Sequence, residues 1–91
     1  MDLNCHPVLT AHVRLKIDPV SGDPILVFPE GVMILNSTAH DILSLCDGKA
    51  TGREILTVLS AQFEVDEPTL RSDVVECLTD LLHRNLILLK P

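Results

Sequence analysis

Apolar and polar positions in the first third of the chain follow the pattern of β-strands. Residues 13–18 (VRLKID) alternate with a period of two, typical of a strand with one buried face and one face in water. The stretch 18–24 (DPVSGDP) is rich in turn residues and predicts a hairpin loop. The apolar run 25–28 (ILVF) predicts a central strand covered on both faces. A tight turn at 29–31 (PEG) then leads to a third strand at 32–35 (VMIL).

The period of the apolar positions changes to 3.6 after this strand, which predicts three helices. The first begins at an N-cap within residues 36–38 (NST) and ends at the glycine of residues 47–48 (DG). The second begins at a capping box, residues 51–54 (TGRE). The third carries Pro68 in its first turn and ends near Asn85, which tolerates a left-handed backbone.

Together these elements predict an α+β fold that is winged helix-turn-helix-like, a three-stranded antiparallel meander followed by three helices. Residues 1–12 show neither period and predict a flexible N-terminal arm. Residues 13–91 are expected to form a single domain. The apolar segment 86–89 is ambiguous, because it fits a last short strand or a tail packed on the core.

The third predicted strand poses a problem of pairing. In a meander it lies at an edge of the sheet, yet it contains no charge and no proline to protect it. The first strand, also an edge, carries Arg14 and Lys16. Two interpretations stay open. The third helix or the segment 86–89 covers or pairs with the strand, or the strand is an open edge at which another molecule adds.

The charge of the chain narrows the range of partners. The formal net charge is −6, from seven basic and thirteen acidic residues. Nucleic acids are bound mainly through clustered Lys and Arg, so a nucleic-acid partner and a winged-helix transcription regulator are disfavoured. A membrane role is not expected, since there is no basic amphipathic helix and no apolar run of about 18 residues. Without a signal peptide, the expected location is the cytoplasm.

No motif for catalysis is found. The serines lack the context of a nucleophile, and the four glycines occupy turn positions rather than a phosphate-binding loop. Cys5, Cys46 and Cys77 are too far apart in sequence for a zinc ribbon, and the histidines lack the spacing of metal ligands. We therefore expect a binding module rather than an enzyme, with no cofactor and no metal.

Several short blocks of the sequence resemble the PqqD family of pyrroloquinoline quinone biosynthesis. They are HVRL at 12–15, FPEGV at 28–32, LN at 35–36, ILSLCDGKATGREI at 42–55 and DLLHRNLI at 80–87. The resemblance extends over about residues 12–89. The block LCDGKATGREI is its most specific part. Asn85 stands where glycine is expected in many relatives, and it tolerates the same left-handed conformation.

The resemblance implies a winged-helix-like fold and a role as a peptide chaperone. Proteins of this family bind the leader region of the precursor peptide PqqA and present it to the radical SAM enzyme PqqE, without performing chemistry themselves. A recognition domain of another modified-peptide pathway is the alternative. In related domains the leader peptide adds as a strand beside the third strand, in a groove closed by the third helix. The resemblance thus favours an open docking edge over a covered strand.

Transferred to this sequence, the resemblance implies two sets of peptide-binding residues. The strand residues for backbone pairing are Val32, Met33, Ile34 and Leu35. The candidates on the third helix are Leu70, Asp73, Val74, Cys77, Leu78 and Leu81. Which of the helix residues line the groove and which belong to the core is left open. An edge of this kind also permits a homodimer by strand exchange.

Overall fold

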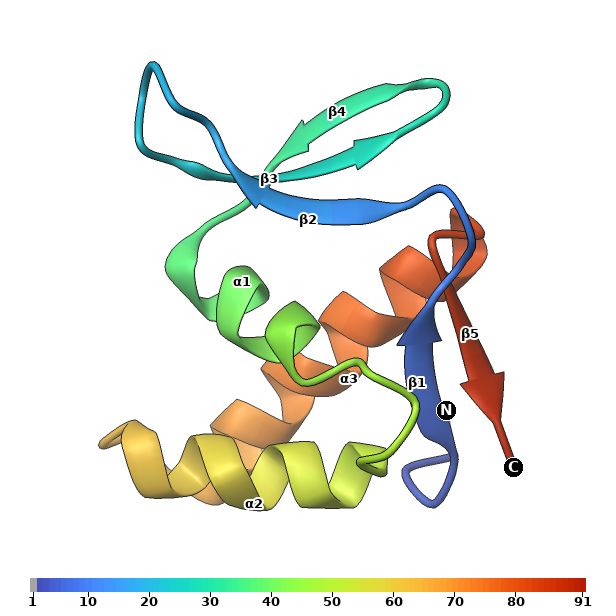
Figure 1. Ribbon diagram of the computed structural model, residues 1–91. Helices are drawn as coiled ribbons and strands as arrows, with labels where there is room; N and C mark the ends of the chain where they lie inside the picture. Colours follow the sequence, from blue (N-terminus) through green and yellow to red (C-terminus); the bar gives the residue numbers. More distant parts are fainter. Residues whose placement is uncertain (1) are drawn as a thin grey trace.

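A computed structural model describes residues 2–91 of the chain. Five strands and three helices follow one another, with β1 first and β5 last (Figure 1). Their bounds are β1 His6–Leu9, β2 Arg14–Ile17, β3 Pro24–Phe28, β4 Gly31–Ile34, α1 Ser37–Ser44, α2 Gly52–Gln62, α3 Glu67–His83 and β5 Ile87–Lys90. None of the helices within residues 2–91 has the length and apolar character needed to cross a bilayer.

The predicted meander is confirmed. Strands β2, β3 and β4 form an antiparallel sheet in that order, with β3 in the middle. In Figure 1 this sheet lies at the top of the molecule and all three helices lie below it. The prediction that β3 is covered on both faces is therefore wrong. Its Leu26 is fully buried, whereas Ile25 and Val27 on the opposite face are only half-buried.

The prediction of a flexible arm at residues 1–12 is wrong for the stretch that forms β1. This strand pairs antiparallel with β5, from His6 opposite Lys90 to Leu9 opposite Ile87. The ambiguous C-terminal segment is thus a strand, and its partner is β1. His6 and Lys90 are 84 positions apart. No local pattern predicts such a pair, because the hydrogen bonds between the two strands join residues at opposite ends of the sequence.

The other edge of β1 is attached to the connection between α1 and α2. The Gly48 amide donates to the Pro7 carbonyl at 3.0 Å, and the Gly52 amide donates to the Cys5 carbonyl at 3.1 Å. Leu3 packs against Gly52, where an added Cβ would come within 2.9 Å of its side chain. The N-terminal segment therefore joins the start of α2 to the C-terminal strand.

The helices begin at the signals found in the sequence, but α1 ends at Ser44 with Leu45 as its C-cap, and the predicted end at residues 47–48 is therefore wrong. Asn36 caps α1 by accepting from the Ala39 amide at 2.7 Å. Thr51 and Glu54 form the capping box of α2, with both hydrogen bonds present at 2.9 and 3.0 Å. Asn85 follows α3 in a left-handed conformation, with φ of 60°. These signals are local, which is why sequence alone finds them.

One hydrophobic core lies between the sheet and the helices. It is formed by aliphatic side chains of the inner face of the sheet, of all three helices and of β5. The largest fully buried side chains are Leu26, Ile42, Leu43, Ile55, Leu59, Leu70, Leu78, Ile87, Val74 and Pro7. Because all three helices lie on the inner side of the sheet, with α1 nearest to it, the outer face of the sheet and the free edge of β4 remain in solvent.

Candidate functional site

Strand β4 is an open edge of the sheet. It pairs with β3 on one side, and no strand within residues 2–91 pairs with its other side. The segment that might have covered it, now β5, pairs with β1 instead. The sequence left open whether the C-terminal segment pairs with β4, and the structure excludes this pairing.

The backbone groups that β4 presents at this edge follow from its register with β3. The Leu35 amide donates to the Pro24 carbonyl at 3.0 Å, and the register places Met33 opposite Leu26. In an antiparallel pair, residues that bond to the neighbouring strand alternate with residues whose N–H and C=O point the other way. Leu35 and Met33 thus bond to β3, whereas Val32 and Ile34 direct their N–H and C=O groups to the open edge.

The side chains of β4 alternate between the two faces of the sheet. Met33 lies opposite the buried Leu26 and packs against the core. Val32 and Ile34 point to the outer face and are 59% and 74% exposed. These two residues therefore combine an open backbone edge with solvent-exposed apolar side chains.

A groove of about 800 Å³ begins just beyond the end of β4, between α1 and α3. Its α1 wall is formed by Asn36, Thr38, Ala39 and Ile42. Its α3 wall is formed by Asp73, Glu76, Cys77, Thr79, Asp80 and His83. Ile42 is buried and Cys77 half-buried, so these two side chains form an apolar floor. The carboxylates of α3 stand at the exposed rim.

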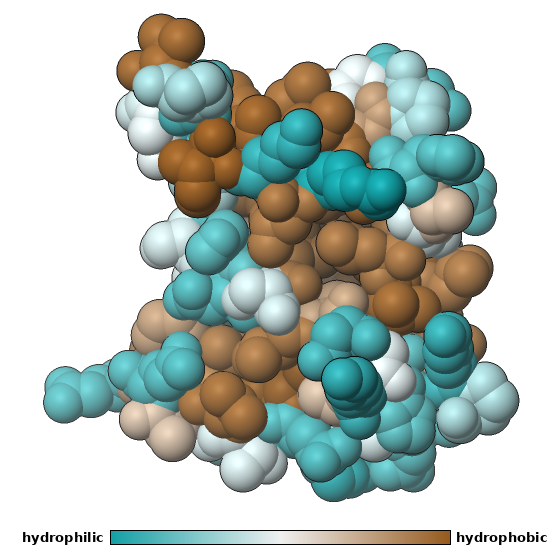
Figure 2. Space-filling view, in the orientation of Figure 1, coloured by the Kyte–Doolittle hydropathy of each residue, from teal (hydrophilic) through white to brown (hydrophobic). Residues whose placement is uncertain are grey.

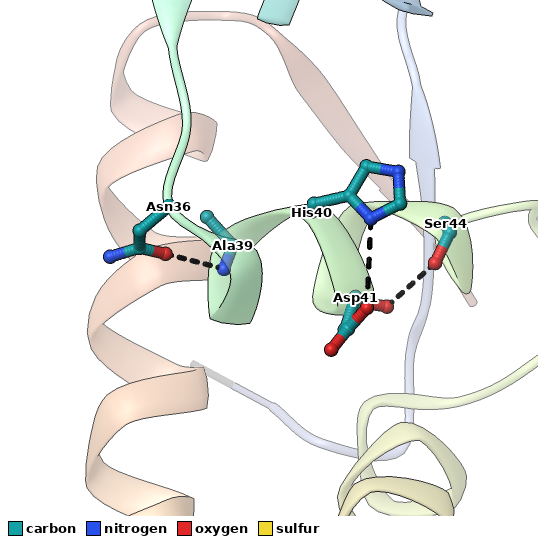
Figure 3. Close-up of polar contacts among 5 residues, drawn as sticks. All are labelled: Asn36, Ala39, His40, Asp41 and Ser44. Carbon is teal, nitrogen blue, oxygen red and sulfur yellow. Dashed lines mark hydrogen bonds and ion pairs between the residues drawn. The ribbon is translucent and has the colours of Figure 1, made fainter. Parts of the chain in front are cut away.

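The α1 wall is held in place by local hydrogen bonds at the start of the helix. Figure 3 shows the Asn36 amide turned onto the first turn of α1, where its oxygen accepts from the Ala39 amide. His40 lies 3.6 Å from the Asp41 carboxylate, and the Ser44 hydroxyl donates to the Asp41 carbonyl. Since Asn36 follows β4 by two residues, the cap also fixes how the strand leads into the groove.

The rim of the groove is negatively charged. Asp73, Glu76 and Asp80 lie on one face of α3 at helical spacing, and no Lys or Arg is among the lining residues. Arg84 forms an ion pair with Asp80 at 3.1 Å, but both side chains are more than half exposed. Within residues 2–91 Asp73 and Glu76 form no ion pair, so the rim keeps a net negative charge. Burial, with the nearby Asp80 carboxylate, raises the pKa of the Cys77 thiol and keeps it neutral.

The structure separates the predicted helix residues into two groups. Leu70, Val74, Leu78 and Leu81 are core residues, at most 3% exposed, and they do not line the groove. Asp73 and Cys77 do line it. This division has a simple cause. The apolar stripe of α3 faces the body of the molecule, and the groove lies along the next, mostly polar face.

Several groove residues were missed by sequence reasoning. They are Glu76, Thr79, Asp80 and His83 on α3, and Asn36, Thr38, Ala39 and Ile42 on α1. On α3 the spacing 73, 76, 80 and 83 marks one helical face, so a signal was present. Nothing in the sequence indicated that the start of α1 would be the opposite wall, because that depends on how two helices pack.

The chain resembles known proteins over most of its length. Residues 25–87 match the family model described as Coenzyme PQQ synthesis protein D (PqqD). A PqqA binding protein of Rhodopseudomonas palustris is 34% identical over 83 residues, 91% of this chain and 81% of that protein. A PqqA binding protein of Acinetobacter baylyi is 35% identical over 88 residues, 97% of this chain and 88% of that protein.

Two solved structures share the fold. One is the solution NMR structure of the PqqD truncation of Methylobacterium extorquens PqqCD, described as a functional, stand-alone RiPP recognition element. It matches with a TM-score of 0.76 and 28% identity, over 90% of this chain and 87% of that one. The other is TbiB1 in complex with the TbiA(beta) leader peptide, with a TM-score of 0.74 over 88% of this chain and 93% of that one. At 22% identity this second likeness supports the fold alone.

Proposed function

Because the chain belongs to the PqqD family, we propose that it is a peptide chaperone of PQQ biosynthesis that binds the precursor peptide PqqA. In this proposal the peptide adds as a strand at the open edge of β4 and continues along the groove between α1 and α3. The protein then presents the bound peptide to the radical SAM enzyme PqqE, and it performs no chemistry itself. The names of the R. palustris and A. baylyi relatives support the choice of peptide.

The observation that carries this proposal is the open edge of β4. Val32 and Ile34 together direct two N–H and two C=O groups to solvent, in the alternation that an added strand requires. Strand addition of this kind is a common mode of peptide recognition. The groove starts where these groups end, so one extended peptide can use both features.

The energies indicate why the edge and the groove are both needed. Four backbone hydrogen bonds at about 0.5–1.5 kcal/mol each supply about 2–6 kcal/mol. The loss of translational and rotational freedom on association costs an estimated 4–15 kcal/mol. Backbone pairing alone therefore binds a peptide weakly. Affinity must come from apolar side chains on the Ile42 and Cys77 floor, and from basic side chains at the acidic rim.

The proposal is tested by titrating the ¹⁵N-labelled protein with synthetic PqqA from the same genome. Amide shifts should be largest at residues 31–39 and at residues 73–83 on α3. A peptide of the same composition in scrambled order is the control. Shifts confined to β1 and β5, or no shift at micromolar concentrations, would rule out docking at β4.

A homodimer by strand exchange is proposed as a competing use of the same edge. In such a dimer a strand contributed by each copy pairs with the open β4 edge of the other, in the place of the peptide strand. Sedimentation of the free protein over a range of concentrations tests this. If PqqA dissociates the dimer, both partners use β4. A dimer that persists with bound peptide would have a different interface.

A further inference from the structure

A second pocket, of about 570 Å³, lies at the opposite end of β4 from the groove. Its walls come from three connections. They are Thr10, Ala11 and Val13 between β1 and β2, residues 28–30 at the turn between β3 and β4, and residues 84–86 after α3. In Figure 1 this turn and the end of α3 lie on the same side of the molecule. The volume falls within the range of ligand-binding pockets, roughly 300–1,000 Å³, and this pocket is called the end pocket below.

The interior of the end pocket is apolar. Leu86 is buried and Phe28 is half-buried, so their side chains form its floor. The polar groups that Thr10 contributes to the wall are already paired, because its amide and its hydroxyl both donate to the Leu86 carbonyl, at 3.1 and 3.2 Å. The charged side chains of Glu30 and Arg84 are exposed and stand at the mouth. A ligand of the end pocket must therefore place apolar groups in its interior.

Apolar surface alone does not assign an occupant to this pocket. Figure 2 shows hydrophobic side chains over other parts of the molecule as well, both on the sheet and below it. Apolar atoms make up more than half of the surface of folded proteins in general. What distinguishes the end pocket is its position, because the turn that forms one of its walls leads directly into Gly31, the first residue of β4. The pocket thus continues the edge at which the peptide is proposed to dock.

The register of β4 decides which side chains of an added strand reach each end of the edge. Side chains alternate between the two faces of a sheet, and residues directly opposite each other share a face. The residues of an added strand that lie beside Leu35, Met33 and Gly31 therefore point to the inner face. The first of them lies next to the groove, which begins at Asn36, and the last lies next to Phe28, which pairs with Gly31.

Gly31 leaves the approach to the end pocket open. It has no side chain, and within residues 2–91 no heavy atom beyond its chain neighbours lies within 4 Å of the position that a Cβ would occupy. No side chain at this position of β4 therefore separates an added strand from Phe28 and the pocket behind it. A side chain docked beside Gly31 and one docked beside Leu35 are four positions apart, about 13 Å along an extended strand.

From this arrangement we infer that the end pocket is a second anchoring site for the precursor peptide, and that it takes an apolar side chain four positions from the one that enters the groove. The inference rests on the proposed function for the peptide strand at β4. The groove and the end pocket hold the two ends of one extended segment. The spacing is the same for either direction of the peptide chain, because side chains alternate in the same way in both. Peptides are thus selected by the spacing of two apolar residues.

The test fills the end pocket without changing β4. Ala11→Leu adds an aliphatic side chain at an exposed residue of the pocket wall. Ala61→Leu is the matched control, because it makes the same change at an exposed position on α2, away from the groove and the end pocket. The affinity of each variant for synthetic PqqA is measured by calorimetry. The unmodified protein, labelled with ¹⁵N, is titrated with PqqA, and each apolar residue of the peptide is replaced by alanine in turn.

The expected result is the loss of one of two anchors. Ala11→Leu should bind PqqA at least about tenfold more weakly, the factor that burial of one aliphatic side chain supplies, whereas Ala61→Leu should bind within about twofold of the unmodified protein. In the peptide scan the two largest losses should fall four positions apart. One of these two replacements should cost little further affinity in Ala11→Leu, because its anchor is already displaced there. In the unmodified protein, the amides of residues 84–86 should shift on titration.

Three outcomes would overturn the inference. They are equal affinities of the Ala11 and Ala61 variants, largest losses in the peptide scan at another spacing, and unchanged amides at residues 84–86 when the peptide is bound. Should Ala11→Leu not fold, the titration and the peptide scan decide the question, because both use the unmodified protein.

Failure of the inference is distinguishable from failure of the proposed function. If the unmodified protein does not bind PqqA, or binds it without shifts at β4, the proposed function is wrong. If the peptide shifts the amides of β4 but not those of residues 84–86, and Ala11→Leu binds normally, only the second anchoring site is wrong.

Discussion

Replacing Ile34 with proline tests strand addition by removing a single backbone hydrogen-bond donor from the edge of β4. Proline has no N–H, and the Ile34 N–H points to the open edge rather than to β3. The substitution should therefore remove one donor from the docking edge and leave the sheet paired. Ile34 is 74% exposed, so little buried apolar area is lost. We expect the free energy of unfolding to change by about 1 kcal/mol or less.

The expected effect on peptide binding is much larger. A peptide carbonyl that docks opposite Ile34 would lose its donor and stay unpaired inside the complex. Leaving such a group unsatisfied costs about 1–3 kcal/mol. Since 1.4 kcal/mol corresponds to a factor of ten, the Kd for PqqA should rise about 5- to 150-fold. Calorimetric titration with the peptide measures this, and urea unfolding of the same variant measures its stability.

The chain offers a matched control at the opposite edge of the sheet. The Asp18 amide donates to the Asp23 carbonyl at 2.8 Å, so by alternation Ile17 also directs its N–H away from β3. Ile17 is 54% exposed and lies at the free edge of β2. Ile17→Pro should leave PqqA affinity unchanged. Docking at β4 is refuted if Ile34→Pro folds and binds normally, or if both variants lose affinity equally.

Three further predictions concern the groove, the helix caps and the N-terminal strand. Leu78→Ala should lower the free energy of unfolding by about 2–5 kcal/mol, because it opens a cavity in the core. Glu76→Ala on the groove face should change the free energy of unfolding by less than about 0.5 kcal/mol and should weaken PqqA binding instead. Denaturant unfolding and calorimetry separate the two, and equal destabilisation would contradict the division of α3 into core and groove faces. Hydrogen bonds from Thr69 lower the pKa of Asp66 below its usual 3.8, and those from Thr51 lower the pKa of Glu54 below 4.5. The contribution of these two carboxylates to the free energy of unfolding is complete above their usual pKa values, and it is lost as pH falls through their lower pKa values in the folded protein. Stability in urea should therefore decline below about pH 4.5, and it should decline less steeply in Asp66→Asn. Deletion of residues 2–9 should expose the amides of β5 to hydrogen exchange, and unchanged protection there would show that β1 does not hold β5 in place.

The sequence by itself determined the local elements of this protein. The period of two predicted the meander, and the period of 3.6 with Asn36, the Thr51–Glu54 box and Asn85 predicted the three helices. It also predicted that β4 lies at an edge of the meander without protecting charges, and it left open whether another segment of the chain covers or pairs with that edge. These features were predictable because helix caps, turns and apolar periods depend on residues only a few positions apart.

Only the tertiary structure decided which segments pair or pack with one another. It paired β1 with β5 across nearly the whole chain, so the expected arm became a strand and the C-terminal segment no longer competed for β4. It turned the leucine stripe of α3 into the core and placed the neighbouring acidic face opposite α1, to form the groove. A leucine at helical spacing must be buried against something, but its sequence does not say against what, because that depends on contacts between distant segments.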